Sequence, residues 1–228
     1  MVFTAFSGSH QDAINKCLAL RGDDDAWDVA YLPIDPHDIG RTYQEVIRIN
    51  SQSGKGGVAY VLHRDHGYDL PRWLQIDFSS AVQHLAEQSE AEVASDQIHQ
   101  LFCDTYLNVP GAWSLGRYEV TKDEAEHQLT AVLGASDGET QIQGRGTGVL
   151  DAFIDAMEQV TGKKMVLVEY SEHTLGQSSD AEAVCYVQLN IEGARPCGVG
   201  RSNDIVQATL NAILSALQGH CQLTENAA

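Results

Sequence analysis

The sequence predicts an α+β protein in which one supersecondary unit is used twice. Residues 144–160 and 198–217 each begin with Gly-x-Gly and continue as an amphipathic helix, and the two starts, Gly144 and Gly198, are 54 residues apart. Similar segments at a fixed offset indicate a repeated structural unit. The predicted unit runs strand, turn, strand, Gly-rich turn and helix.

The strands before each Gly-x-Gly alternate apolar and polar residues, as half-buried strands do. In the first copy they precede a turn at residues 137–138, and in the second a turn at residues 192–193. The apolar positions are Leu129, Ala131 and Leu133 in the first copy and Cys185, Val187, Leu189 and Ile191 in the second.

Helices dominate the prediction for the first half of the chain. Residues 2–6 are predicted as a short buried strand, and residues 10–18 and 38–49 as helices with one apolar stripe. The Gly-rich residues 51–57 are predicted as a loop and residues 58–62 as a strand.

Two further helices are expected before the repeated units. Pro71 stands at a tolerated first-turn position of one helix, and Ser95 is a capping residue for the next. Val109-Pro110-Gly111 is the strongest candidate for a domain boundary. A helical linker region is therefore expected first, and an α+β domain over residues 113–222 after it.

Composition and charge exclude several classes of partner. The 228 residues are 43% hydrophobic and 20% charged, and their formal net charge is −18. This balance argues against nucleic acid and against an anionic membrane surface, since both bind through Lys and Arg. No apolar run approaches about 20 residues, and no signal peptide is recognised. The five cysteines are scattered, which favours reduced thiols and a cytoplasmic location.

The Gly-x-Gly motifs allow three interpretations. They could cradle a phosphate at a helix N-terminus, form tight strand-to-helix turns, or bind a small carboxylate such as an amino acid through turn N–H groups. Neither motif has the third Gly of a dinucleotide fingerprint. Residues 54–57 are also a poor phosphate loop, because a helix is expected before them and a strand after them.

Four histidine and tyrosine positions are candidates for functional residues. His63 and His66 have metal-like spacing, but they fall in a predicted hairpin turn with no third ligand nearby, so a metal site is not expected. His10 and Tyr43 lie outside obvious core runs. A His can exchange protons near neutral pH, but one His and one Tyr do not make a catalytic constellation.

Several stretches together resemble alpha-isopropylmalate synthase over essentially the whole chain, and related homocitrate and citramalate synthases share parts of the pattern. The stretches are FTAFSGSHQDAI (3–14), YLPIDPHDIGRTYQEVIRINSQSGKGGVAYVL (31–62), LPRWLQIDFSSAVQ (70–83), GRGTGVLDAF (144–153), YSEH (170–173), DAEAVCYV (180–187) and GVGRSNDIVQATLNAILSAL (198–217).

The resemblance implies the C-terminal part of that family. It predicts a linker subdomain at residues 1–62, a helical linker subdomain at 67–108, and a dimeric leucine-binding domain of two βββα modules at 113–222. The family's catalytic (β/α)8 barrel is expected to be absent from this chain, and with it the divalent metal site, so no cofactor is expected and the chain alone is predicted inactive.

Site residues carry over from the family at matching positions. In the family, a His and a Tyr of the linker reach into the partner subunit's barrel, and they match His10 and Tyr43. The leucine contacts match Gly146, Gly148, Leu150, Leu167, Tyr170, Thr174 and Ala181. This chain departs from the family pattern at Val149 and Thr174, which bears on leucine affinity and selectivity.

Three functional hypotheses follow for the chain. The first is the linker and allosteric part of 2-isopropylmalate synthase, an acyltransferase of leucine biosynthesis, with leucine and a second copy of the chain as partners. The second is a subunit that complements a separately encoded barrel-bearing chain. The third is a free-standing amino-acid sensor.

Overall fold

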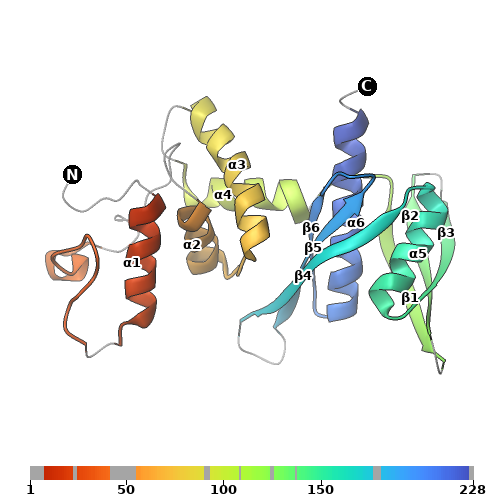
Figure 1. Ribbon diagram of the computed structural model, residues 1–228, viewed down its shortest axis with the longest axis horizontal. Helices are drawn as coiled ribbons and strands as arrows, with labels where there is room; N and C mark the ends of the chain where they lie inside the picture. The colour runs from red at the N-terminus through yellow and green to blue at the C-terminus, as the bar shows by residue number, and fades with distance from the viewer. Residues whose placement is uncertain are drawn as a thin grey trace. The chain divides into compact units, whose positions relative to one another are not determined.

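The computed structural model describes residues 8–22, 25–41, 55–89, 93–107, 109–123, 126–136, 138–176 and 181–225. The chain divides into two units, Met1–Leu101 and Phe102–Ala228 (Figure 1). The strand predicted at residues 2–6 and most of the helix predicted at 38–49 lie outside the described residues.

The described part of the first unit is helical. Its elements are α1 (Gly8–Leu20), the 3-10 turn η1 (Pro36–Ile39), α2 (Lys55–His66), α3 (Arg72–Ser89) and α4 (Ser95–Phe102). The helices predicted after residue 9, after Pro71 and at Ser95 are confirmed. Their inward faces supply the core of the unit, in which Leu62, Leu74, Phe78 and Ile98 are fully buried.

The strand predicted at residues 58–62 is wrong, because this segment belongs to α2. Its buried residues are Gly57, Val58, Val61 and Leu62, a spacing that places them on one helical face. The two valines and Tyr60 of this segment favour a strand, and packing against α1 and α3 overrides that preference. His63 and His66 therefore lie in the last turn of a helix and not in a hairpin turn.

The second unit contains the two predicted βββα modules. The first is β1 (Ser114–Lys122), β2 (His127–Ala135), β3 (Gly138–Gly146) and α5 (Val149–Thr161); the second is β4 (Met165–Leu175), β5 (Glu182–Ile191), β6 (Cys197–Ser202) and α6 (Ile205–Glu225). Each set of strands is an antiparallel sheet, in the orders β1-β2-β3 and β4-β5-β6. The described residues contain no parallel barrel.

Tight turns set the register of the sheets. Glu192 and Gly193 both have positive φ, 53° and 91°, and they form a two-residue turn between Ile191 and Ala194, which are bridged, in the connection from β5 to β6. The predicted strand residues of both copies are confirmed: the apolar positions of β2 and β5 are buried. The outer strands β1 and β4 each carry an irregularity, after Leu115 and after Leu167.

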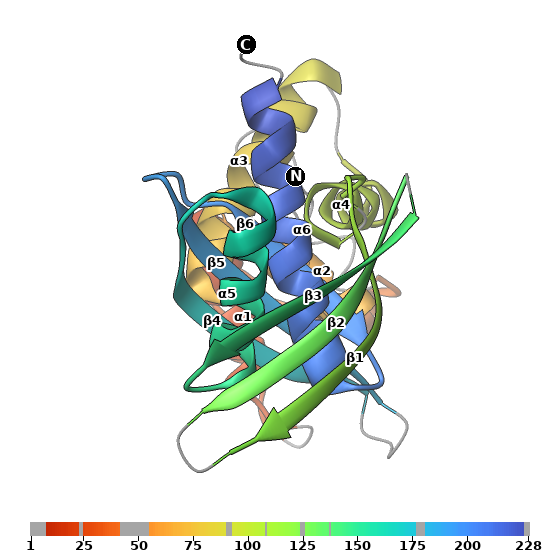
Figure 2. The ribbon, with the colours of Figure 1, turned by 90° about the vertical axis from the view of Figure 1, so that its right-hand side faces the viewer.

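Both helices lie between the two sheets and share one core with them (Figure 2). Helix α5 packs mainly on β3 and β2, and α6 mainly on β6 and β5. Helix α6 also contacts β1, and α5 contacts β4, so the two modules interlock. Cys185 and Cys197 are buried residues of this unit, as predicted.

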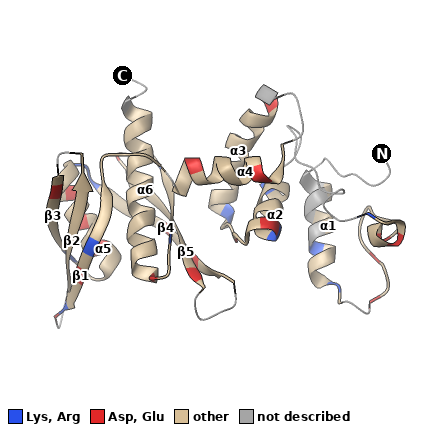
Figure 3. Ribbon diagram, turned by 180° about the vertical axis from the view of Figure 1, so that it is seen from behind, with Lys and Arg blue, Asp and Glu red and all other residues tan. Residues whose placement is uncertain are grey.

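Charge and hydropathy of the described residues fit the sequence analysis. Lys and Arg positions are few and spread over both units (Figure 3). Among the helices described, none has the length and apolar character needed to cross a membrane.

Candidate functional site

The Gly-x-Gly motifs are not strand-to-helix turns; they lie within the last strand of each module. A Cβ at Gly144 would overlap the carbonyl oxygen of Ala152 and lie 2.6 Å from the backbone nitrogen of Ala156 on α5. Gly198 and Gly200 meet the backbone of α6 in the same way. These glycines are needed because a helix backbone approaches the strand closely. The turn interpretation is therefore corrected, and close helix packing explains the repeat.

Gly148 differs from the other glycines of the first motif. It is the N-cap of α5, with φ −148° and ψ 176°, and no side chain caps the helix there. A Cβ at Gly148 would meet no atom within 4 Å. Gly146, two residues earlier, is approached by Asp151 and Ala152 of α5. Gly146 and Gly148 are both predicted to contact the ligand leucine. Of the two, Gly148 faces open space and Gly146 faces the helix.

The start of α6 contrasts with the start of α5. Asp204 Oδ1 accepts hydrogen bonds from the backbone N–H groups of Val206, at 2.9 Å, and Gln207, at 3.4 Å. This carboxylate satisfies helix donors that would otherwise need another acceptor. At α5, the nearest carboxylate, Asp151, instead accepts a hydrogen bond from the hydroxyl of Thr147. The N-terminus of α5 therefore lacks the side-chain acceptor that α6 has.

Three of the residues predicted to contact the ligand leucine lie on one face of β4. Leu167, Tyr170 and Thr174 are paired with Leu189, Val187 and Ala183 of β5, whose side chains all belong to the buried core. Directly paired residues of antiparallel strands point to the same face. This face is the one that packs toward α5 and α6.

Tyr170 is the most connected of these residues. Its hydroxyl donates a hydrogen bond to Glu172 and lies 3.2 Å from the hydroxyl of Thr209 on α6. Burial first, and then the bond to Glu172, raise the pKa of Tyr170 above its ordinary value. Tyr170 as a residue is nevertheless 39% exposed. Tyr170 is thus a neutral hydroxyl at neutral pH, placed at a partly open edge of the core.

The apolar residues of the predicted site all keep part of their surface exposed in the second unit. Leu150, in the first turn of α5, and Leu167 both pack against the shared core and remain partly exposed. Ala181 is also partly exposed and directly precedes β5. Three cavities of about 360 to 420 Å³ in the second unit are lined by other residues.

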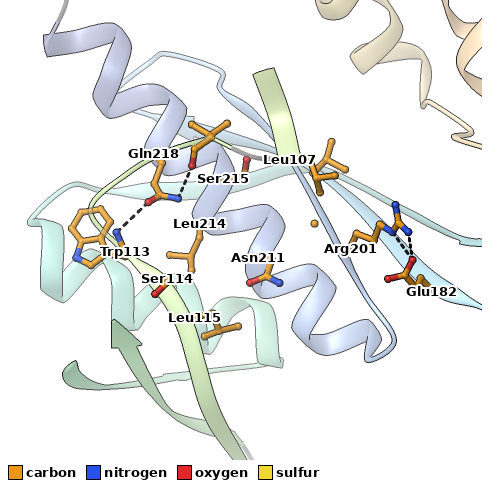
Figure 4. Close-up of a pocket in the computed structure, with 13 residues that line it drawn as sticks. Leu107, Trp113, Ser114, Leu115, Glu182, Arg201, Asn211, Leu214, Ser215 and Gln218 are labelled. Carbon is orange, nitrogen blue, oxygen red and sulfur yellow. Dashed lines mark hydrogen bonds and ion pairs between the residues drawn. The ribbon is translucent and has the colours of Figure 1, made fainter. Parts of the chain in front are cut away.

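The cavity of about 420 Å³ lies between the segment before β1, β6 and α6 (Figure 4). Arg201 and Glu182 form an ion pair at its side, with Arg201 Nε 2.6 Å from the carboxylate. Asn211 and Gln218 extend into it from α6 (Figure 4). Sequence reasoning missed this cavity, because its residues come from segments that no short spacing connects.

The two candidate catalytic residues are placed only in part. His10 lies in α1, half-buried, and its ring centroid is 4.1 Å from that of Tyr31. Tyr43 lies outside the described residues. The structure therefore does not test whether His10 and Tyr43 act together.

His66 belongs to a small polar cluster of the first unit. Its ring stacks on that of His99 with centroids 3.9 Å apart, and Ser95 donates a hydrogen bond of 2.6 Å to Asp65 beside it. Ser95 thus uses its hydroxyl to join two helices. The hydrogen bond from Arg64 holds the pKa of Asp65 below its ordinary value. No group of three or more metal-ligating side chains occurs in the part of the chain that is described.

Comparisons with known proteins identify both parts of the chain. The family described as alpha-isopropylmalate synthase, post-catalytic domain-like, matches residues 1–63, and the LeuA allosteric (dimerisation) domain matches residues 92–220.

Individual relatives support the same assignment. The 2-isopropylmalate synthase of Alcanivorax borkumensis is 45% identical over 218 residues, covering 95% of this chain and 39% of the relative. Those of Rhizobium meliloti and Thermobifida fusca are 46% and 44% identical, each covering 95% of this chain and 40% of the relative. The chain thus spans about two-fifths of the length of the curated relatives it matches. From these matches and the two βββα modules, we conclude that the chain belongs to the alpha-isopropylmalate synthase family and corresponds to its C-terminal, post-catalytic and dimerisation part.

Proposed function

We propose that this chain is the linker and allosteric part of a 2-isopropylmalate synthase, which forms a homodimer through residues 113–222 and binds leucine for feedback inhibition. The observation that carries the proposal is the start of α5, which has no side-chain cap, in a unit where apolar residues of β4 remain partly exposed. The overall reaction proposed for the whole enzyme joins acetyl-CoA and 2-oxoisovalerate to give 2-isopropylmalate.

The α5 N-terminus supplies the carboxylate end of the proposed leucine site. Backbone N–H groups of a first helical turn have no partner within the helix, and the helix dipole favours an anion there. At α6 the carboxylate of Asp204 occupies the equivalent position. At α5 the ligand carboxylate would take this place, next to Gly148, where no side chain stands in the way. The comparison supports one leucine per chain.

The apolar end of the site is formed by Leu150, Leu167 and Ala181. Each is only partly buried in the single chain, so a bound isobutyl group would remove further apolar surface from water. The loss of two or three methylene equivalents costs about 1–3 kcal/mol, so alanine is expected to bind at least about tenfold more weakly than leucine. Thr174 adds a hydroxyl on the same strand face, which bears on selectivity.

Dimer formation would complete this pocket. Helix α5 packs mainly on β3 and β2, and α6 mainly on β6 and β5, which leaves the same faces of β1 and β4 partly exposed. On β1 these half-covered residues are Leu115, Tyr118 and Val120, and on β4 they include Leu167. A second copy is the proposed cover, because the matched domain is a dimerisation domain.

Proton transfer is the proposed role of His10 and Tyr43 in the complete enzyme. Both residues fall in the stretches that resemble the family's linker. Their action would require a barrel, supplied by a longer form of the chain or by a barrel-bearing partner chain. The chain by itself is proposed to bind leucine without turning over substrate.

Calorimetric titration of the intact chain with leucine, valine and alanine tests the proposed site. Leucine should bind most tightly, with one site per chain, and Gly148→Val should abolish binding by filling the space in front of α5. Gly219→Val is the matched control, because a Cβ there also meets nothing within 4 Å. Absence of heat and of a thermal shift at millimolar leucine, or unchanged binding by Gly148→Val, would show that the assignment is wrong.

A further inference from the structure

Thr209 places a hydroxyl on the buried side of α6. The residue is 2% exposed, and Ala208, Leu210 and Ala212 beside it are apolar and fully buried. Valine has nearly the same shape as threonine and carries no polar atom, so it would avoid the cost of burying a hydroxyl. A hydroxyl at such a position needs hydrogen-bond partners.

The helix itself supplies one partner of Thr209. The hydroxyl donates a hydrogen bond of 2.9 Å to the carbonyl of Ile205, four residues earlier. Threonine side chains can form this bond within any helix. The bond is enough to satisfy the buried hydroxyl, so the benefit of a further contact goes to the partner group.

Two side chains of the neighbouring sheet meet the same oxygen. The sulfur of Cys185 on β5 lies 3.2 Å from it, and so does the hydroxyl of Tyr170 on β4. Either hydroxyl can donate the proton across the contact between Thr209 and Tyr170. Because sulfur is a weak hydrogen-bonding atom, the contact with Tyr170 is the stronger of the two. Thr209 thus links α6 with β4, an edge strand of its sheet.

The other strong hydrogen bond of Tyr170 stays within β4. The hydroxyl donates to Glu172, an exposed residue two positions along the same strand. Such a bond moves with the strand and does not fix the tyrosine relative to a helix. Since Tyr170 is 39% exposed, core packing covers only part of it. The contact with Thr209 is therefore the hydrogen bond that fixes the Tyr170 hydroxyl relative to α6.

Anchoring of this side chain bears on ligand binding. A partly exposed tyrosine without an anchor can change rotamer, and fixing it when a ligand binds costs conformational entropy. An anchored ring has already lost this freedom, so more of the contact energy is available for the ligand. Tyr170 shares its strand face with Leu167 and Thr174, which are also predicted to contact leucine.

We propose that Thr209 is a positioning residue of the amino-acid site: its buried hydroxyl holds the Tyr170 side chain in the orientation that receives leucine. The proposal rests on the proposed function, because it requires Tyr170 to contact the ligand. Thr209 is itself buried, so its effect on the ligand passes through Tyr170 and not through direct contact.

The test is calorimetric titration of the intact chain and of two Thr209 variants with leucine. Thr209→Val keeps the shape of the side chain and removes the hydroxyl. The leucine Kd should rise about fivefold, which corresponds to the roughly 1 kcal/mol of a typical hydrogen bond. Thr209→Ser keeps the hydroxyl and loses a methyl group, and its Kd should stay close to that of the wild type.

Urea denaturation of the same variants separates positioning from packing. Loss of a buried methyl group should destabilise Thr209→Ser, whereas Thr209→Val keeps the packing. A role in packing alone predicts that the serine variant is the more affected in both stability and affinity. Positioning predicts opposite orders: the serine variant loses more stability, and the valine variant loses more affinity.

A double-mutant cycle with Tyr170→Phe identifies the route of the effect. In the Tyr170→Phe chain the contact is already lost, so Thr209→Val should change the leucine Kd little further. Equal fold changes with and without the Tyr170 hydroxyl would overturn the proposal, because Thr209 would then act independently of Tyr170. Thr161→Val on α5 is the matched control: its hydroxyl also donates to a carbonyl four residues earlier, at 2.8 Å, and its loss should not change the Kd.

The outcomes distinguish this proposal from the proposed function. Normal leucine binding by the wild type, with an unchanged Kd in Thr209→Val, would overturn the positioning role and leave the leucine site standing. No leucine heat in the wild type would overturn the site, and the positioning role with it. If circular dichroism shows that Thr209→Val does not fold, Thr209→Ala takes its place, since alanine and serine differ only in the hydroxyl; equal Kd values for these two would overturn the proposal.

Discussion

The hydroxyl of Tyr118 on β1 donates a hydrogen bond to the carboxylate of Asp204 at the start of α6. The bond joins the first module to the helix of the second. The other carboxylate oxygen of Asp204 accepts the N–H groups of Val206 and Gln207, so one side chain both caps α6 and anchors β1. Because the pKa values of both Tyr118 and Asp204 are shifted, the stability that this link contributes should depend on pH.

Removal of this hydroxyl should destabilise the fold by a small amount. Tyr118→Phe keeps the ring and deletes the bond to Asp204, and a typical net hydrogen bond contributes about 1 kcal/mol. Because the pair is partly exposed, the loss should be about 1 kcal/mol or less. Urea denaturation at fixed protein concentration measures it. A variant more stable than the wild type at neutral pH would contradict the role of the bond.

The difference in stability between the wild type and Tyr118→Phe should have a plateau in pH. Burial and the Asp204 carboxylate raise the pKa of Tyr118 from 10.0 to about 12, so its contribution is full below pH 10 and is lost as the pH rises toward 12. The bond from Tyr118 holds the pKa of Asp204 below its ordinary 3.8, so that contribution is present above this value and is lost as the pH falls further. Denaturation across these ranges checks both limits; a difference that stays constant from pH 9 to 12 would refute the alkaline limit.

Gly200→Ala should destabilise the chain by about 1–3 kcal/mol, the usual cost of overpacking. The added Cβ would overlap the carbonyl oxygen of Ala208, and rigid helix backbone cannot move aside as a flexible side chain can. Gly219→Ala, within α6 itself, is the control: its Cβ meets nothing within 4 Å, and alanine favours the helix by up to about 1 kcal/mol. Equal stability of the two variants in urea would show that helix packing does not explain the glycine repeat.

The chain should sediment as a dimer at micromolar concentration, with twice the monomer mass of 24.8 kDa. Val120→Glu should shift it toward monomer, since it places a charge on the half-covered face of β1. Leu20→Glu, on an exposed position of α1, controls for the added charge itself. Circular dichroism must show that both variants fold. A wild-type monomer across the concentration range would rule out the proposed dimer.

The chain alone should not make 2-isopropylmalate. It corresponds to about two-fifths of each relative, and the residues proposed for catalysis here are only His10 and Tyr43. Thiol release from acetyl-CoA with 2-oxoisovalerate and a divalent metal measures turnover, and activity above background would contradict the prediction. If a barrel-bearing chain is added and activity appears, His10→Ala and Tyr43→Phe should each lower it.

Local sequence patterns were sufficient to predict the last two strands and the helix of each repeated module, whereas the first strand was implied by the family resemblance. Alternation over Leu129–Leu133 and over Cys185–Ile191 identified β2 and β5, because half-buried strands need one apolar face. The dipeptide Glu192-Gly193 identified a hairpin whose φ values only a few residue types adopt readily. Nearby residues determine these features.

The interpretation of the glycines needed the tertiary structure. From the sequence, Gly144-x-Gly146 fitted a turn or a ligand loop equally well. In the structure, atoms of α5 fill the space beside Gly144 and Gly146. Gly148 is the glycine of this motif that faces open space. Which atom approaches a glycine is a property of packing between elements, and the spacing of glycines does not encode it.

The sequence by itself determined the α+β class and the repeated pattern of strands and helix, since turn preferences and apolar periodicity act over a few residues. Its longer motifs carried the resemblance to the family. Only the tertiary structure decided that residues 58–62 are helical, because packing against α1 and α3 outweighs the weak strand preference of Val58, Tyr60 and Val61. It likewise revealed the contacts of Gln218 with Val109 and Trp113, more than one hundred residues away. Such contacts form only when distant segments pack together, so no local pattern in the chain records them.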